Sequence, residues 1–526
     1  MTKMADTRWR PKPGDRVFHP RRITRPRLRR ILGIPGLFSI GYGDVGSSIY
    51  YALGVTALVA LGATPIALGI AGVIYIFNAL TYAEGSAMIP EGGGSASYAR
   101  LAFNDMAGFA SGWVLMLSYI VTVAISAYTI PPYLSHFWPV LSQPVAGTFA
   151  SMGIVVFLLV VNVIGIKESS GMNVFFIAVD IITQITLVML GVVLLLMPNP
   201  GLLVQNMFGE GNWPSASSLI FGIAIAALCF TGVESVSQHG EETRQPEKKM
   251  PRTYILMVVT VLVLFAGISL VALTAMTPQE LGDPVNGWAR DPVAGIASAV
   301  STAISPEEVA AGVPSEEARI IIVWLLGGVR ELLPALVALL AATILLTATN
   351  AGLLGISRLT YNLSTHRQLP ATLGRVHHHF RTPYIAIILF SLACLMILIP
   401  GFFSQTFFAD LGALYVFGSL LTFAIAHAAI LRLRMTKPEL HRPFRLGGNL
   451  RIGGWALPLT AILGMLGTAV IWVVVIIIQP YSRWAGLSWL AIGFIVYYIY
   501  RKSQRMSLFH ADKPPVPPDE QRKRET

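Results

Sequence analysis

Residues with unusual chemistry for a membrane segment lie inside the first long apolar stretch of the chain, at positions 41–54, which read GYGDVGSSIYYALG. Three glycines there (Gly41, Gly43 and Gly46) weaken a helix, and the carboxylate of Asp44 is costly inside a bilayer. A charge at this depth usually faces a cavity and is paired with an ion, a proton or another side chain. Because broken membrane helices are a common way to build polar sites, we expect the floor of a binding site here, with Asp44 facing a cation.

A second carboxylate follows a glycine in the sixth apolar stretch, which reads LCFTGVESVSQHGEE. The pattern predicts a helix break near Thr231 and Gly232, with Glu234 directly after it. A lone glycine in a membrane helix often serves only close packing, and this would account for Gly232. It does not account for carboxylates near glycines in two stretches, so we predict two broken helices of related function.

Hydroxyl groups accompany these carboxylates at spacings that favour a shared site. Ser47 and Tyr51 follow Asp44, and Tyr51 lies two helical turns further along the same side. In the third stretch, the spacing of three and four residues places the hydroxyls of Tyr119, Thr122 and Ser126 on one helix face. The tenth stretch adds the hydroxyl of Tyr415. Each alone has an ordinary structural explanation, because membrane Ser and Thr often bond to the preceding turn and Tyr often packs. Together, hard oxygen ligands suit an alkali cation and not a transition metal.

The elements that must position these residues are membrane helices. The chain has 526 residues, is 54% hydrophobic and 12% charged, and has a mean hydropathy of +0.64, which excludes a soluble globular protein. Apolar stretches of about 20 residues, each long enough to span a bilayer, recur along the chain. We predict an all-α polytopic membrane protein with twelve transmembrane helices near 37–60, 64–88, 106–133, 145–166, 171–198, 216–238, 253–276, 332–357, 383–400, 406–431, 455–479 and 484–500.

The distribution of charge predicts the orientation of the chain. The net charge is +11, and the 38 Lys and Arg residues gather in the tails and alternate loops. If both termini lie in the cytoplasm, nearly all Lys and Arg residues are cytoplasmic, as the positive-inside rule requires. The four that lie on the other side are Arg290, Arg319, Arg330 and Arg483. This pattern indicates a lipid bilayer as the partner of the basic segments and argues against nucleic acid.

The domain organisation follows from the same pattern. We expect a basic cytoplasmic tail over 1–36, a helical core over 37–435, two further helices within 436–500, and a disordered cytoplasmic tail over 501–526. Cys229 and Cys394 both lie in apolar stretches, so no disulfide framework or zinc site is expected, and no cofactor beyond transported ions.

Longer motifs resemble a known superfamily. The stretches TGVESVSQHGEETRQPEKKMPR at 231–252, YAEGSAMIPEGGGSASYARLAF at 82–103 and AGLLGISRLTYNLSTHRQLP at 351–370 resemble permeases of the amino acid-polyamine-organocation superfamily. The resemblance covers about residues 36–435. It implies a LeuT-like inverted repeat of five plus five helices, with the first and sixth broken, two additional helices, and a location in the bacterial cytoplasmic membrane.

Within that superfamily, DVGSSIYYAL at 44–53 resembles the potassium-uptake permeases of the KimA and Kup type, which carry an aspartate followed seven residues later by a tyrosine. That resemblance implies uptake of K⁺ coupled to H⁺ by alternating access. It places potassium ligands at Asp44, Tyr51, Tyr119, Thr122, Ser126, Thr231 and Tyr415. The candidates for carrying the proton are Glu234, Asp44 and Asp180, and a packing role for Asp180 bonded to Gln184 is an equal alternative.

Two other functions stay open. The first is a permease for an amino acid or polyamine, working by proton symport or antiport, in which Asp44 pairs with the ammonium group of the substrate. The second is a non-transporting membrane sensor. We expect no enzymatic activity, a small cation or small molecule as the ligand, and an oligomeric state that includes a homodimer as one option.

Overall fold

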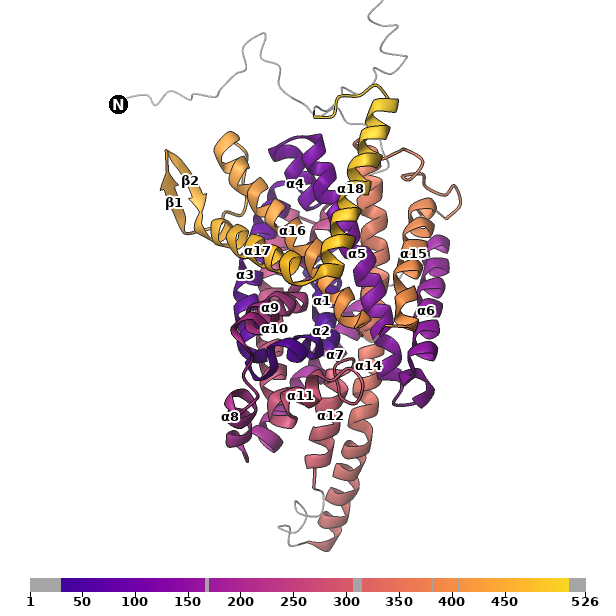
Figure 1. Ribbon diagram of the computed structural model, residues 1–526, viewed down its shortest axis with the longest axis vertical. Coiled ribbons are helices and arrows are strands. Elements are labelled where there is room, and N and C mark those ends of the chain that lie inside the picture. The colour runs from indigo at the N-terminus through magenta and orange to yellow at the C-terminus, as the bar shows by residue number, and fades with distance from the viewer. Residues whose placement is uncertain (1–29, 166–169, 306–314, 381, 405, 510–526) are drawn as a thin grey trace, which may run out of the picture.

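The computed structural model describes residues 30–165, 170–305, 315–380, 382–404 and 406–509, and it is predominantly helical (Figure 1). The helices are α1 (Ile34–Val45), α2 (Ile49–Ala60), α3 (Thr64–Met88), α4 (Ser95–Ala102), α5 (Asp105–Leu134), α6 (Pro144–Ile164), α7 (Ser170–Gly191), α8 (Pro200–Phe208), α9 (Ala216–Ala226), α10 (Pro246–Ala275), α11 (Pro278–Gly282), α12 (Pro292–Ala303), α14 (Glu316–Thr365), α15 (Tyr384–Leu398), α16 (Phe407–Thr436), α17 (Leu459–Ile478) and α18 (Pro480–Ser503).

Ten helical stretches in the described part of the chain are long and apolar enough to cross a membrane. The first of them, Ile34–Met88, contains two of the predicted spans, because α1, α2 and α3 follow one another with only short 3₁₀ turns between them. The last predicted span corresponds to α18, which is not among the ten. A helix therefore lies at each of the twelve predicted positions, and the number of crossings stays a prediction.

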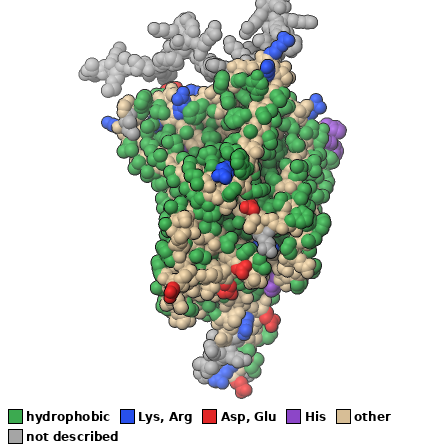
Figure 2. All heavy atoms as spheres, viewed as in Figure 1, with side chains coloured by type: hydrophobic (Ala, Val, Ile, Leu, Met, Phe, Trp, Pro, Cys, Tyr) green, Lys and Arg blue, Asp and Glu red, His purple; other side chains and the backbone are tan. Residues whose placement is uncertain are grey.

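The middle of the bundle is built around α5. Its most apolar window is 100% buried, and it packs against α14, α16 and α4. By contrast, the most apolar windows of α7 and α17 are each only 28% buried, so these helices expose apolar side chains on the flank. Figure 2 shows hydrophobic side chains covering much of the face in view, as expected for a surface that faces lipid. Several Lys and Arg side chains lie at the upper end in that view, but the orientation of the termini stays a prediction.

Two features at the ends of the bundle differ from the sequence-based expectation. A short antiparallel hairpin, β1 (Asn449–Ile452) and β2 (Trp455–Pro458), connects α16 to α17, so the fold is not purely helical. Its turn uses Gly453 and Gly454 at φ 55° and 86°, a conformation that favours glycine. The second difference concerns the C-terminal tail, because α18 continues to Ser503 and the described chain reaches residue 509. Residues 1–29 and 510–526 of the predicted tails lie outside the described residues.

The connection before α14 contains the helices α11 and α12, and α14 itself begins before the predicted span. The helix α14 begins at Glu316 and runs for 50 residues, although the predicted span begins only at residue 332. Figure 1 shows that α12 and the first part of α14 project beyond the bundle, opposite the end that carries α4 and the end of α18.

A buried charge cluster joins α3 to α16 and to the segment before the hairpin. The Glu84 carboxylate accepts hydrogen bonds from Arg434 at 2.8 and 2.6 Å and from the Leu446 amide at 2.9 Å, and Arg442 lies 3.7 Å away. One carboxylate therefore compensates two guanidinium groups that are almost fully buried.

Replacing Glu84 by alanine is expected to destabilise the folded protein by about 3–5 kcal/mol, because it leaves two buried cations without their anion. Thermal unfolding of the purified protein in detergent measures the effect. The matched control is Glu91→Ala, which removes a partly exposed carboxylate paired with Arg100 and is expected to cost only about 0–1 kcal/mol. Equal losses in the two variants would show that the Glu84 cluster does not stabilise this end of the bundle.

Candidate binding site at two helix breaks

The first break is smaller than the sequence suggested. The helix α1 continues through Gly41 and Gly43, so the expectation of a break at these two residues is wrong. Gly41 instead permits close packing, because a Cβ there would lie 2.5 Å from Met257 Sδ and from Val236 Cγ2. The change in the helix is a single 3₁₀ turn, η1 (Gly46–Ser48), between α1 and α2.

The second break lies where it was predicted and is larger. The helix α9 passes through the 3₁₀ segment η5 (Ala227–Phe230) into an extended Thr231, followed by Gly232 at φ +98°. A second 3₁₀ segment, η6 (Val233–Glu242), then continues the chain. The left-handed backbone at Gly232 is a conformation that side chains rarely adopt, so glycine makes this interruption possible.

The two breaks meet at Asp44. A Cβ placed on Gly232 would lie 2.7 Å from Asp44 Cγ and 3.0 Å from Oδ2. The space that any other residue would fill at position 232 is therefore occupied by the Asp44 carboxylate. The sequence could not show this contact, because it joins residues of α1 and η6 that are far apart along the chain.

The two carboxylates at this meeting point are almost completely buried. Asp44 is 2% exposed and Glu234 is 1% exposed, and each acts on the other electrostatically. Within the described part of the chain, Asp44 Oδ1 and Glu234 Oε2 have no hydrogen-bond partner. Asp44 also interacts with Ser235, and Glu234 with nearby backbone amides, but a buried carboxylate with one oxygen unpaired is still unfavourable as an ion, so this arrangement calls for a cation or for protons.

Tyrosine hydroxyl groups from three helices surround the carboxylates. The Tyr51 hydroxyl lies 3.1 Å from Ser48 Oγ and acts electrostatically on Asp44. Tyr415 of α16 interacts electrostatically with both carboxylates, and so does Tyr119 of α5. The Tyr119 hydroxyl has no hydrogen-bond partner among the described residues, and the same is true of Ser126 on the same helix. The structure thus brings three of the predicted hydroxyls, those of Tyr51, Tyr119 and Tyr415, close to the carboxylates.

Three other predicted ligands donate their hydrogen bonds locally. Ser47 donates to the Asp44 carbonyl at 2.9 Å, and Thr122 donates to the Ser118 carbonyl at 2.9 Å. Thr231 donates to the carbonyl of Leu228 at 2.8 Å. These bonds match the ordinary role of hydroxyls in membrane helices, although each oxygen keeps lone pairs that can still accept a ligand.

Asp180 belongs to a different cluster. Its carboxylate accepts a hydrogen bond from Tyr50 at 2.6 Å and one from Gln184 at 2.7 Å, which is the pairing expected for a packing role. Tyr50 also accepts, through its carbonyl, a 2.7 Å hydrogen bond from Tyr133. These partners differ from the residues around Asp44 and join α7 to the first broken helix, while a role of Asp180 in carrying the proton stays a prediction.

Sequence reasoning missed several buried polar groups next to Glu234. Gln238 follows it on η6, Ser97 lies on α4, and Tyr82 lies on α3. Gln238 and Ser97 lie in the motifs that carried the superfamily resemblance, but nothing in their residue types singled them out. Their significance depends on burial, which only the folded structure provides.

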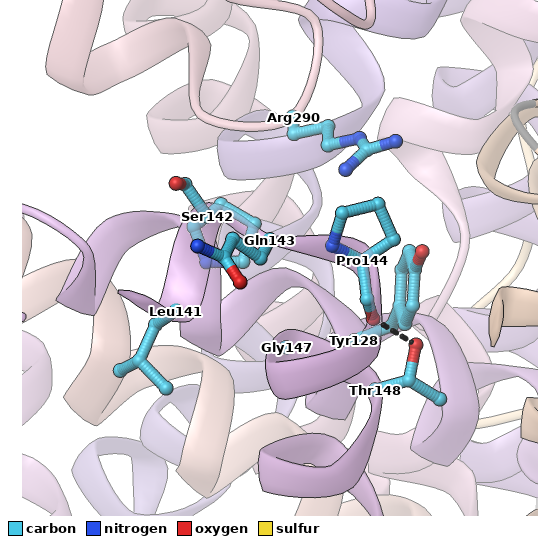
Figure 3. A pocket seen from close by; sticks show the side chains of 9 residues that line it. Tyr128, Leu141, Ser142, Gln143, Pro144, Gly147, Thr148 and Arg290 are labelled. Atoms are coloured by element: carbon cyan, nitrogen blue, oxygen red, sulfur yellow. Dashed lines mark hydrogen bonds between the residues drawn. The ribbon is translucent and has the colours of Figure 1, made fainter. Parts of the chain in front are cut away.

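The pocket drawn in Figure 3 is a separate feature. It lies between the end of α5, the turn at Pro139–Ser142 and the start of α6, and the guanidinium group of Arg290 lies beside Pro144 and Tyr128. None of its lining residues belongs to the candidate site, so we assign it no part in binding.

A bundle of membrane-length helices, two of them interrupted beside buried carboxylates, defines the chain as a polytopic membrane transport protein and not an enzyme. The family comparison agrees. The model of the family described as "Amino acid permease" matches residues 32–500, and the chain belongs to this family.

Curated relatives are similar over most of their length. The chain is 25% identical over 501 residues to the branched-chain amino acid permease BcaP of Bacillus subtilis, covering 91% of this chain and 95% of the relative. It is 26% identical over 511 residues to the methylthioribose transporter of the same organism, with coverages of 91% and 95%. The glutamate/serine transporter AimA of Bacillus subtilis is 22% identical over 437 residues, covering 80% of this chain and 74% of the relative.

These comparisons correct one sequence-based prediction. The superfamily is as expected, but the predicted closeness to potassium-uptake permeases is not supported, since the relatives named above are carriers of organic solutes. The motif could not distinguish the two kinds of substrate, because an aspartate and a tyrosine seven residues apart offer the same oxygens to K⁺ and to an ammonium group.

Proposed function

We propose that the protein is a secondary transporter for a small organic solute that carries an ammonium group, of the amino acid or polyamine type. The observation that carries this proposal is the pair of buried carboxylates where the two helix breaks meet, with Asp44 Oδ1 and Glu234 Oε2 unpartnered in the described chain. An ammonium group has three donors and one positive charge, so it satisfies both oxygens and compensates one carboxylate.

The second carboxylate then needs a proton, and we propose that Glu234 carries it. Two ionised carboxylates at one buried site repel each other, and a single ammonium group compensates only one of them. Glu234 lies on the 3₁₀ segment η6, directly after the larger break, where a change in backbone can alter its surroundings. Proton binding at this residue would link solute movement to the proton gradient by alternating access.

Potassium uptake is the second candidate function. It is favoured by the neutral oxygens of Tyr119, Ser126 and Tyr415, which would complete a shell of hard ligands around a bare cation. It lacks support among the relatives described above, and the organic ammonium proposal accounts for the same carboxylates.

Uptake by the purified protein in proteoliposomes separates these proposals. The panel consists of radiolabelled leucine, serine, lysine, putrescine and rubidium, each measured with and without an inward proton gradient. We expect accumulation of at least one of the four organic compounds, stimulated by the gradient, and no accumulation of rubidium. Rubidium uptake without uptake of any organic compound would refute the proposed function and support potassium transport.

A further inference from the structure

A second group of buried polar side chains lies beyond Glu234, toward the end of the bundle where Figure 1 places α4. Gln238 is 3% exposed and Ser97 is 1% exposed. Neither the amide nitrogen nor the amide oxygen of Gln238 has a hydrogen-bond partner among the described residues, and the same holds for Ser97 Oγ. A buried amide with neither end paired is rare in folded proteins and calls for an explanation.

These side chains converge on two consecutive glycines from three elements. A Cβ on Gly94 would collide with Ser237 Oγ and lie 3.0 Å from Gln238 Nε2. A Cβ on Gly93 would collide with Ser97 Oγ and lie 2.8 Å from Asn362 Oδ1 of α14. The polar atoms of η6, α4 and α14 thus surround the turn before α4, and Gly94 has φ +50°. We call Ser97, Gln238 and Asn362, with the backbone of Gly93 and Gly94, the glycine-turn cluster.

Tyr82 connects this cluster to the two carboxylates. It is completely buried, acts electrostatically on Glu234, and lies beside Ser95, at the start of the helix that carries Ser97. Tyr82 therefore links the surroundings of Glu234 to the start of α4, the helix that carries Ser97.

The charged residues nearest this end of the path have partners of their own. Arg100 pairs with Glu91 at 3.1 Å, and Arg358 pairs with Glu242 at 3.1 Å. Glu241 accepts a 3.5 Å hydrogen bond from the Gly92 amide. The cluster itself is neutral and lies in the field of Glu234, so it can hold a cation more weakly than the paired carboxylates do.

We propose that the glycine-turn cluster is a second binding subsite, through which the ammonium group passes between the Asp44 site and the predicted cytoplasmic side. This inference rests on the proposed function for the identity of the cation. A site of neutral oxygens next to a site of carboxylates suits release, because the ammonium group exchanges strong ligands for weak ones before it reaches water.

Cysteine accessibility tests the subsite without knowledge of the natural solute. Ser97→Cys is introduced into a background in which Cys229 and Cys394 are replaced by alanine, and inside-out membrane vesicles are treated with aminoethyl or sulfonatoethyl methanethiosulfonate. We expect the Ser97→Cys thiol to react with the ammonium reagent about tenfold or more faster than with the anionic reagent, because a cation-binding subsite concentrates cations and repels anions. The matched control is Ser391→Cys on α15, another buried serine with an unpartnered hydroxyl, which is expected to react with neither reagent.

Two outcomes would overturn the inference: a Ser97→Cys thiol as unreactive as the Ser391→Cys thiol, or one that reacts equally fast with both reagents. If Ser97→Cys does not fold, Gln238→Cys gives the same readout at the facing position. The result is independent of the proposed function, because a failure of that proposal appears as rubidium uptake without uptake of any organic compound, whatever the reactivity at Ser97→Cys.

Discussion

Replacing Asp44 by asparagine is expected to weaken binding of the transported compound by about a hundredfold or more, equivalent to roughly 3 kcal/mol, because a buried ammonium group loses its counter-charge. The side chain keeps nearly the same volume, so it still fits in the space beside Gly232. Equilibrium binding of the radiolabelled compound to the purified variant measures the change directly.

The control for this variant is Asp410→Asn, the same chemical change at a half-buried aspartate near the start of α16 that accepts a hydrogen bond from Thr406. It is expected to leave binding unchanged. Full binding by Asp44→Asn, or an equal loss in both variants, would show that Asp44 does not hold the cation.

Replacing Gly232 by alanine is expected to abolish measurable transport. The new Cβ would lie 2.7 Å from Asp44 Cγ, and alanine at φ +98° is strained. The left-handed backbone costs about 1–2 kcal/mol and overpacking costs about 1–3 kcal/mol, so either the break changes its conformation or the carboxylate is displaced. Initial rates of uptake in proteoliposomes, together with the thermal stability of the same preparation, report both effects.

The control for this second variant is Gly69→Ala on α3, where an added Cβ meets no atom within 4 Å. Alanine in an open helical position is expected to leave transport unchanged and to stabilise the helix by about 0.5–1 kcal/mol. Normal transport by Gly232→Ala would mean that the contact between the two breaks is not needed for function.

Much of the fold could be predicted because membrane helices must satisfy simple physical limits. Apolar length predicted the positions of twelve spans, and a helix lies at each of them, since only stretches of about 20 apolar residues can span the hydrocarbon core. The break at Thr231 and Gly232 was also predictable, because glycine weakens a helix and the nearby carboxylate indicates a polar site at that point. The tail boundary was less exact, since Arg501 is buried against Asp105 at 3.3 Å, a pairing that sequence distance conceals.

The parts that could not be predicted depend on tertiary contacts. Gly41 has the same residue type as Gly232, yet α1 continues through it, and only the positions of Met257 and Val236 show that it serves close packing. Asp180 had two possible roles in the sequence, and only the folded structure shows that both Tyr50 and Gln184 bind it. Gln238 attracted no notice in the sequence, because an amide near a loop is ordinary until it is buried without a partner.

The central claim is that Asp44 and Glu234 bind a positively charged group where the two helix breaks meet. A cryo-electron microscopy structure of the protein saturated with the organic compound it transports best tests this claim most directly. We predict an ammonium nitrogen about 3 Å from the carboxylate of Asp44. A bound solute whose carboxylate lies at the helix breaks, with its ammonium group directed away from Asp44 and Glu234, would contradict the claim.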